Sequence, residues 1–475
     1  MKKNLKKLIA ICLTGAMAMS MVACGNSGSS EPAADTSTVE DERGGVETAE
    51  EPVTPEAEST SDSTESGDKI HITMSTYLTN DAQRAPLLEY VGGAINEKFP
   101  NVDFEFKIYS DRQNMFVEVA GGAGPDILDL DGPTDVVEFA EAGKAVDLTP
   151  YAEQYGWQDV ISEWAYDTSV YDGKLYSMPA GFEGMGMYYN MEVMEEHGWS
   201  VPSDLEELES LMAEIKEAGL IPLSFGNANY QGAVDHLYST MLSCFSGPDV
   251  VKKAINGEIK FDDPQMVASI EKFKEWWDKG YVMDQASQTV TQDDQLAFLA
   301  DGRAVMSICG TWWGPQIVQT FPECDWTFEL MPVLNEDAGA LFPLAVGESY
   351  AINSNAEHPE ICAEILNFLY TDMDTFYTAV NNGAIQPFPI EAFDFEKLEG
   401  MDEKVLHMNE VMAKASADNN IGYCSWSFWP TDARTYMNEN FDAVLLGSLT
   451  PQEYMANTQP YIDEALEKGT TPILP

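Results

Sequence analysis

The segment from residue 70 to residue 142, IHITMSTYLTNDAQRAPLLEYVGGAINEKFPNVDFEFKIYSDRQNMFVEVAGGAGPDILDLDGPTDVVEFAEA, decides the fold class. Short apolar runs predict strands at 70–74, 102–108 and 126–130, and longer amphipathic runs predict helices at 82–99, 111–120 and 134–142. Strands that alternate with helices in this way predict an α/β fold with a mostly parallel sheet and right-handed crossovers. Ligands bind such sheets beyond the carboxyl ends of the strands, so residues just after these strands are candidate site residues.

The rest of the chain continues with helices and shorter strands. An extended stretch at 175–190 is interrupted by Gly181, Gly184 and Gly186. The other predicted strands are 221–225, 304–309 and 326–330, and the other predicted helices are 203–218, 233–245, 264–279, 292–300, 358–370, 372–381, 402–417, 431–446 and 451–467.

Length and charge narrow the class of protein. Residues 69–475 are too many for one ordinary hydrophobic core, so we expect two lobes. The chain carries 80 Asp and Glu against 25 Lys and Arg, a formal net charge of −55. Such a surface repels phosphate backbones, so nucleic acid is excluded as a partner.

The N-terminus is typical of a secreted lipoprotein. Four lysines precede an apolar run at 8–23, which is short for a membrane span and typical of a signal peptide. The run ends in Met21-Val22-Ala23-Cys24, which resembles a bacterial lipobox. We therefore expect residues 1–23 to be removed and Cys24 to carry a lipid that anchors the protein to the outer face of the cell membrane. An ordinary signal peptide with an incidental cysteine is the alternative.

Residues 25–68 have the composition of a linker. They contain thirteen acidic residues, one basic residue (Arg43) and no aromatic residue. Burying so little apolar surface cannot offset the conformational entropy that the segment would lose on folding. We therefore predict that residues 24–68 are a lipidated cysteine followed by a disordered acidic tether.

Cysteine and histidine usage does not point to a metal or cofactor. Five cysteines follow Cys24, at 244, 309, 324, 362 and 424, and no CxxC pair occurs. Their odd number leaves at least one unpaired within a single chain, and a disulfide or buried thiols both fit. The chain has only five histidines, with none paired at metal-ligand spacing. We expect no cofactor and no metal.

Several short motifs occur in one order along the chain. They are Gly124-Pro125-Asp126-Ile127, Asp172-Gly173-Lys174-Leu175-Tyr176 with Pro179 and Tyr188-Tyr189-Asn190, Asp301-Gly302-Arg303-Ala304-Val305-Met306 running into Gly310-Thr311-Trp312-Trp313, Ala351-Ile352-Asn353 with His358-Pro359-Glu360, and Leu449-Thr450-Pro451-Gln452-Glu453. In this order and spacing, the chain resembles family 1 of the extracellular solute-binding proteins, which serve ABC importers and include maltose-binding protein. The resemblance covers residues 69–475.

This resemblance implies a two-lobed binding-protein fold of type II, with the ligand cleft between the lobes. The first lobe is expected to hold 69–181 and about 346–392, and the second 182–345 and about 393–475. The family's role implies a monomer that binds a mono- or oligosaccharide and delivers it to the importer's permease subunits.

The resemblance also implies which residues line the cleft. A sugar presents apolar C–H faces ringed by hydroxyls, which aromatic plates and planar polar groups match. Trp312 or Trp313 follows a strand and opens a helix, and Trp429 precedes a helix. The ligand contacts expected from the resemblance are Trp312, Trp313, Trp429, Glu183 and Tyr230. Asp131 and Tyr77 are added because they come just after the third and the first predicted strand.

Each of these residues also has a structural interpretation. A tryptophan in a large protein often belongs to the core, as we expect for Trp276 and Trp277. Glu183 fits a solvated or hinge-bonding carboxylate equally well, and Arg434 on a late helix fits a surface ion pair better than a cleft contact. We expect at least one of Trp312 and Trp313 to face the cleft.

Three other functions compete with sugar binding. A glycoside hydrolase needs a carboxylate pair, which so acidic a chain offers anywhere, and no nucleophile elbow, HExxH or P-loop is present. We therefore expect no enzymatic activity. The same fold could take a cationic solute or a peptide, because the chain is acidic and rich in aromatics. A surface-adhesive lipoprotein is the third alternative.

Overall fold

The computed structural model describes residues 69–228, 233–283 and 288–475. By its contacts the chain divides into Met1–Glu65 and Ser66–Pro475, and only the second unit is described here. Cys24 and the predicted tether at 24–68 therefore lie outside the described residues, as does Tyr230.

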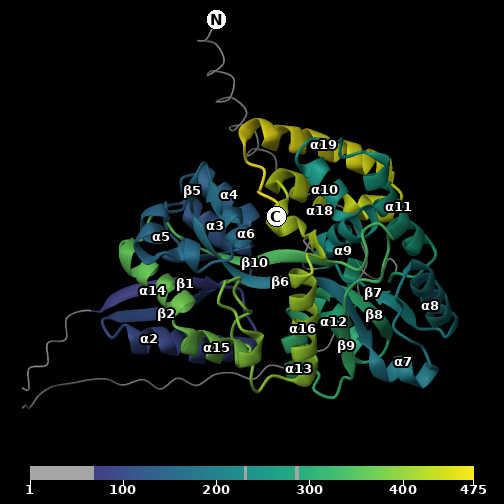
Figure 1. Ribbon diagram of the computed structural model, residues 1–475, viewed down its shortest axis with the longest axis horizontal. Coiled ribbons are helices and arrows are strands. Elements are labelled where there is room, and N and C mark those ends of the chain that lie inside the picture. The colour runs from purple at the N-terminus through teal and green to yellow at the C-terminus, as the bar shows by residue number, and fades with distance from the viewer. Residues whose placement is uncertain (1–68, 229–232, 284–287) are drawn as a thin grey trace, which may run out of the picture. The chain divides into compact units, whose positions relative to one another are not determined.

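The second unit is built on one nine-stranded mixed sheet (Figure 1). Seven strands follow the order β2-β1-β3-β10-β6-β8-β7, while β11 pairs with β10 and β9 with β6. These strands are β1 (Ile70–Thr76), β2 (Val102–Ile108), β3 (Ile127–Leu130), β6 (Ser177–Asn190), β7 (Ile221–Ser224), β8 (Ala304–Gly310), β9 (Trp326–Glu329), β10 (Phe342–Ile352) and β11 (Ile421–Tyr423). A separate hairpin pairs β4 (Val170–Tyr171) with β5 (Lys174–Leu175).

Helices cover both parts of this sheet. One group of helices belongs to the part of the sheet that contains β1, β2 and β3. This group consists of α1 (Asp81–Pro86), η1 (Leu87–Gly92), α2 (Gly93–Lys98), α3 (Arg112–Ala120), α4 (Pro133–Glu141), α5 (Thr149–Tyr155), η2 (Trp157–Asp159), α6 (Glu163–Thr168), α14 (Pro359–Thr371), α15 (Met373–Asn381) and η5 (Phe395–Lys397). The others are α7 (Met191–His197), α8 (Leu205–Glu217), α9 (Ala233–Met241), η3 (Leu242–Ser246), α10 (Pro248–Ile255), α11 (Pro264–Asp278), α12 (Gln292–Ala300), α13 (Trp313–Thr320), α16 (Glu403–Ala417), α17 (Ser425–Phe428), α18 (Thr431–Leu445) and α19 (Pro451–Lys468).

Two long strands, β6 and β10, run through both parts of the sheet and pair with each other antiparallel. Near its start β6 pairs with β10 between Ser177 and Gly184, and its later residues pair with β8 and β9. The far end of β10 pairs with β3. The two strands therefore form the connection between two lobes, visible in the middle of Figure 1.

Each lobe has its own hydrophobic core. The first-lobe core draws on residues between Ile72 and Ala180 and again between Val346 and Leu398. The second-lobe core draws on residues between Phe182 and Ala345 and again from Val405 to Leu474. The last change of lobe thus falls between Leu398 and Val405, a few residues later than the boundary expected near 393.

The helix ends follow local capping chemistry. At α19, the Thr450 side chain and Glu453 each accept from the other's backbone N–H, Pro451 occupies the first turn, and Gly469 ends the helix with φ of 70°. The same capping box joins Thr291 to Asp294 at the start of α12. Both boundaries agree with the sequence prediction.

The sheet differs from the prediction in two respects. The crossing strands β6 and β10 are antiparallel to their neighbours β3 and β8, so parallel pairing is confined to β1 with β2 and β3, β7 with β8, and β10 with β11. The strand β10 is absent from the predicted strands, and its sequence contains Pro343 and Gly347. Pairing on both sides holds it extended despite these residues.

Other features of the described residues bear on the function. None of the described helices is both long enough and apolar enough to cross a bilayer. Within the same residues, His, Cys, Asp and Glu form no group of three or more suited to a metal ion. All five described cysteines are free thiols and are buried, which settles the alternatives left open by the sequence.

Candidate functional site

The first-lobe sheet carries Tyr77 and Asp131 at its carboxyl edge, just after β1 and β3. Arg112, at the start of α3, lies between them. Its Cζ is 4.2 Å from the centroid of the Tyr77 ring, and its Nη2 is 3.4 Å from Oδ1 of Asp131. The backbone N–H of Asp131 donates to Oδ2 of Asp135 at 3.1 Å, which fixes the turn after β3. The ends of β1 and β3 and the start of α3 therefore bring a phenol, a carboxylate and a guanidinium to one edge.

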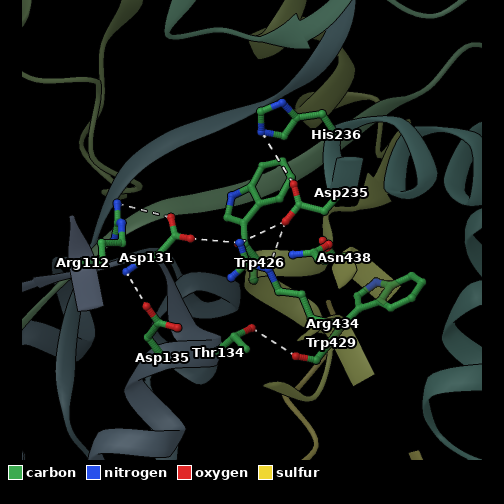
Figure 2. Close-up of polar contacts among 12 residues, drawn as sticks. Arg112, Asp131, Thr134, Asp135, Asp235, His236, Trp426, Trp429, Arg434 and Asn438 are labelled. Carbon is green, nitrogen blue, oxygen red and sulfur yellow. Dashed lines mark hydrogen bonds and ion pairs between the residues drawn. The ribbon is translucent and has the colours of Figure 1, made fainter. Parts of the chain in front are cut away.

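A chain of ion pairs joins this edge to the second lobe. Arg434 of α18 donates from Nη2 to Oδ2 of Asp131 at 2.9 Å and from Nε to Oδ2 of Asp235 at 3.0 Å (Figure 2). Burial opposes the charge of Asp131, but Arg112 and Arg434 outweigh it and hold the pKa of Asp131 below its usual range. Asp131 is therefore an ionised link between the two lobes.

Neutral hydrogen bonds make a second contact between the lobes. Thr134 Oγ1 donates to the backbone oxygen of Trp429 at 3.1 Å, and Thr431 Oγ1 donates to the backbone oxygen of Thr134 at 3.2 Å. Nearby, the Ser427 hydroxyl accepts from the N–H of Val346 and donates to its carbonyl, both at 2.9 Å. The lobes are thus in direct contact along α4, α17 and the start of α18.

The second-lobe wall is aromatic. The rings of Trp312 and Trp426 meet edge to face with centroids 6.1 Å apart, and the His236 ring lies 5.1 Å from Trp312 and 5.4 Å from Trp426. Gly310, the last residue of β8, leaves room for Trp312, since a Cβ at Gly310 would lie 1.9 Å from its ring. Trp312 is half-buried while Trp426 is buried. Burial lowers the pKa of His236 to about 3, so this imidazole is neutral.

Glu183 lies where the two lobes meet on β6. Its Oε1 accepts from Nε1 of Trp426 at 3.1 Å, and its Oε2 accepts from Nε2 of Gln386 at 3.4 Å. The carboxylate rests against Gly347 of β10, where an added Cβ would lie 2.1 Å from Cδ of Glu183. Glycine at this position is therefore what allows Glu183 to sit beside the crossing.

Most carboxyl groups at this junction hold their protons more tightly than usual. Burial, and then the charge of Glu348, raise the pKa of Glu183 and of Asp129. Burial raises the pKa of Asp135 to about 7, with a further contribution from Asp131. Burial likewise raises the pKa of Asp235 to about 6, against the opposing effect of Arg434. Asp135 can therefore donate as well as accept a hydrogen bond near neutral pH.

Three buried polar atoms of the first-lobe wall have no hydrogen-bond partner within the described residues. They are Oη of Tyr77, Nη1 of Arg112 and Oδ1 of Asp129. Buried polar atoms of folded proteins are nearly always hydrogen-bonded to protein or water. Three such atoms beside one another at the lobe junction mark this wall as a place for a polar ligand.

A cavity of about 400 Å³ opens between the lobes beside Thr431, and its lining includes none of Trp312, Glu183, Asp131 and Tyr77. Its first-lobe lining comes from α3 and α4 and includes Phe116 and Glu138. Its second-lobe lining comes from α18 and α19 and includes Asp432 and Tyr461. A solute enclosed there would touch both lobes.

The structure brings together only part of the predicted site. Trp312, Glu183, Asp131 and Tyr77 all lie at the lobe junction. Trp313 instead is 1% exposed and packs 5.7 Å from the ring of Tyr188 in the second-lobe core. Of the two neighbouring tryptophans, Trp312 is the one at the junction.

Trp429 has its backbone, and not its ring, at the lobe junction. Its side chain is fully buried in the second-lobe core, with its ring 5.2 Å from Phe261 and 5.7 Å from Tyr238. In Figure 2 the indole extends away from Thr134, which contacts only the backbone oxygen. The indole that contacts Glu183 belongs to Trp426, three residues earlier.

Sequence reasoning missed four residues of the junction: Arg112, His236, Gln386 and Trp426. It also favoured a surface ion pair for Arg434, which the structure places in a buried one. A signal was available, because Arg434 is the only basic residue between Lys414 and Lys468. Trp426 was missed because the short helix α17 decides which of the two indoles, Trp426 or Trp429, turns toward β6.

Comparison with known sequences finds a protein family whose profile matches more than half of the chain. The profile of the family described as bacterial extracellular solute-binding protein matches residues 94–379. A probable sugar-binding periplasmic protein of Mesorhizobium japonicum is 28% identical over 205 residues, which are 41% of this chain and 46% of that protein. The chain thus spans about half the length of the curated relatives it matches.

Solved structures share the fold. A chitin oligosaccharide binding protein superimposes with a TM-score of 0.72 at 20% identity, covering 84% of this chain and all of the other. The maltose-bound T. maritima MalE3 gives a TM-score of 0.65 at 18% identity over 83% of this chain and 99% of the other. At these identities the likeness shows the two-lobed α/β fold alone.

Proposed function

Since the chain belongs to the family of bacterial extracellular solute-binding proteins, we propose that it binds a carbohydrate between its lobes and delivers it to the permease subunits of an ABC importer. One observation carries this proposal. A half-buried indole, Trp312, stands at the lobe junction with Trp426 and Glu183, opposite a wall whose polar atoms lack partners. An apolar plate beside polar groups suits the two kinds of surface that a sugar presents.

Each side chain has a defined role in this proposal. Trp312, supported edge-on by Trp426, packs against the C–H face of a sugar ring. Glu183 and Asp131 accept hydrogen bonds from hydroxyls, and Arg112 and Tyr77 donate from the atoms that have no partner. Trp313 and Trp429 support the wall from the core, while Tyr230 remains a contact predicted from the sequence. Several relatives named as sugar-binding proteins support this solute class.

Binding closes the lobes and leaves the solute unchanged. The ion pair from Arg434 to Asp131 crosses the junction, so a solute that contacts both lobes stabilises the joined arrangement. The closed protein then presents a fixed surface to the permease. We infer no enzymatic activity and a monomeric receptor that releases its sugar intact.

The membrane address rests on the sequence. We propose that Cys24 is lipidated after removal of residues 1–23 and that the acidic tether holds the binding lobes at the outer face of the membrane. Replacing Cys24→Ser is expected to release the protein into the medium without changing its sugar affinity. Retention of the variant at the membrane would contradict the lipid anchor.

A thermal-shift panel of mono- and oligosaccharides tests the sugar proposal. A ligand that binds only the folded protein raises the melting temperature by mass action, by an amount that grows with its concentration. We expect at least one neutral or amino saccharide to do so, with calorimetry giving one site per chain. A panel in which only peptides or polyamines stabilise the protein would refute it, and cleavage products in the incubated mixture would refute the absence of enzymatic activity.

A further inference from the structure

Two carboxyl groups of the first-lobe wall lie side by side without a cation of their own. Asp129 of β3 pairs with Tyr350 of β10, and Glu348 is two residues from Tyr350 along the same strand. Side chains two residues apart in a strand share a face, so Asp129 and Glu348 are diagonal neighbours on one face of the sheet. Glu348 is the charged group with the largest effect on the ionisation of Asp129.

Asp129 is the less satisfied of the two. Its residue is 7% exposed, and its Oδ1 has no hydrogen-bond partner within the described residues. Glu348 accepts one hydrogen bond from the Tyr350 hydroxyl at 3.0 Å. A buried carboxylate without a hydrogen bond or a cation is costly, and it either takes up a proton or awaits a donor.

The charges that surround the pair do not balance it. Facing Asp129 are Glu348, Arg112, Asp131 and Asp135. Among these only Arg112 is positive, and its Nη2 already lies 3.4 Å from Asp131, which Arg434 also contacts. The lobe junction thus holds an excess of carboxyl groups over guanidiniums.

The chemistry that suits this pair is a compact cation with several N–H donors. A sugar hydroxyl can donate one hydrogen bond to Asp129, but it leaves the negative charge in place. An alkylammonium donates up to three hydrogen bonds and supplies the missing charge. Tyr77, whose hydroxyl also lacks a partner, lies near Asp129 and can accept a further hydrogen bond.

We propose that the solute is an amino sugar whose free ammonium group is held between the carboxylates of Asp129 and Glu348. This inference rests on the proposed function and specifies its substrate class. The sugar ring lies on Trp312, and its amine points toward the first-lobe wall. Removal of the amine's charge by N-acetylation weakens binding, because the two carboxyl groups then lose their counterion.

Matched pairs of sugars test this assignment by isothermal titration calorimetry at neutral pH. The probes are glucosamine, galactosamine and mannosamine, their N-acetyl forms, the parent hexoses, and the β-1,4-linked dimers of glucosamine and N-acetylglucosamine. At least one free amine should bind about tenfold or more tightly than both its N-acetyl form and its parent hexose, the scale of a charge-assisted hydrogen bond.

Variants link the preference to the two carboxyl groups. In Asp129→Asn and Glu348→Gln the tenfold preference for the free amine over its N-acetyl form and its parent hexose should shrink toward one. Glu105→Gln, at an exposed position on β2, is the control and should keep the preference. Circular dichroism melts check folding, and Asp129→Asn should be at least as stable as the natural protein because an amide replaces a carboxyl group whose ionisation is opposed by burial.

The outcomes separate this inference from the proposed function. If neutral sugars bind as tightly as their amines, or if Asp129→Asn and Glu348→Gln keep the full preference, the amino-sugar assignment is wrong and sugar binding stands. If no saccharide of either kind binds, both proposals fall.

Discussion

The two walls of the lobe junction differ in the kinds of groups that they present. On the second-lobe wall, Trp426 donates to Glu183, Arg434 donates to Asp235, and His236 packs against two indoles. Oδ1 of Asp235 is the atom of these groups that is buried without a hydrogen-bond partner among the described residues. On the first-lobe wall, Tyr77, Arg112 and Asp129 each leave a buried atom without a partner. The second lobe is thus preorganised as an apolar plate, and the first lobe supplies the polar groups that a ligand completes.

This difference assigns separate tasks to the two lobes. A rigid indole surface recognises the class of the solute at low entropic cost, since few side chains have to be ordered on binding. Unsatisfied polar groups discriminate within that class, because a solute that leaves them unpaired loses the energy of burying them. We therefore expect the first-lobe wall to determine which solute is preferred, and the second-lobe wall to provide the packing surface for its ring.

The largest expected effect comes from a mutation that breaks the chain of ion pairs joining the two walls. Arg434→Met leaves Asp131 and Asp235 buried without their shared cation, which should lower the free energy of unfolding by about 3–5 kcal/mol. Urea denaturation measures it. The matched control is Arg303→Met, whose exposed pair with Asp301 should cost at most about 1 kcal/mol. Equal losses in both variants would contradict a buried link between the lobes.

The next effect separates a core tryptophan from a cleft tryptophan. Trp429→Ala should lower the stability by about 3–5 kcal/mol, because it opens a cavity against Phe261 and Tyr238, and the folded protein should keep its sugar affinity. Trp312→Ala should weaken sugar binding by about 1–3 kcal/mol with a smaller loss of stability. Melting curves and calorimetry on both variants measure the two effects. A Trp429→Ala protein that melts normally and no longer binds sugar would return Trp429 to the ligand site.

The pH dependence of stability probes the first-lobe wall. The pKa of Asp135 is raised to about 7 in the folded protein, so the folded state binds a proton more tightly than the unfolded chain. Its contribution to stability is full below the unfolded pKa near 4 and is lost as the pH rises through about 7.

Asp135→Asn removes this dependence while keeping an oxygen that accepts from the N–H of Asp131. Between about pH 4 and pH 7 the natural protein should lose a few kcal/mol more stability than the variant does. Denaturant titrations at several pH values measure the difference, and Glu105→Gln serves as the exposed control. Parallel curves for Asp135→Asn and the natural protein would show that Asp135 titrates normally.

The smallest effect concerns the position of Glu183. A methyl group at residue 347 would occupy the space of the Glu183 carboxylate, so Gly347→Ala should displace it and weaken its bond to Trp426. We expect sugar affinity to fall by about 1–2 kcal/mol, the scale of one hydrogen bond to a charged group. Gly93→Ala, where an added Cβ meets nothing closer than 3.8 Å, is the control. Unchanged affinity in Gly347→Ala would exclude Glu183 from the ligand contacts.

Local patterns predicted the regular elements well. The strand β2 and the helix α12 have the predicted bounds, because strict alternation and a capping box are complete within a few residues. The single helix expected at 82–99 instead contains Pro86 and a π-helical turn, η1, in its middle. The long strands β6 and β10 contain glycines that local rules treat as breaks, and only pairing with distant strands keeps them extended.

The site was predictable where it follows the sheet. Tyr77, Asp131 and Trp312 come just after strands, so the topology alone places them at the junction. The orientation of Trp426 against Trp429 depends on the short helix α17 and on packing against Phe261, neither of which a local pattern encodes. Arg112 and His236 lie inside helices, where the sequence does not tell which face turns inward.

A crystal structure of the protein with the tightest-binding saccharide from the panel tests the central claim most directly. We expect electron density for one sugar ring against Trp312, with polar contacts to Glu183 on one side and to the first-lobe residues Asp131 and Arg112 on the other. Sugar density confined to a single lobe, with Trp312 free of contact and the lobe junction unchanged, would contradict it.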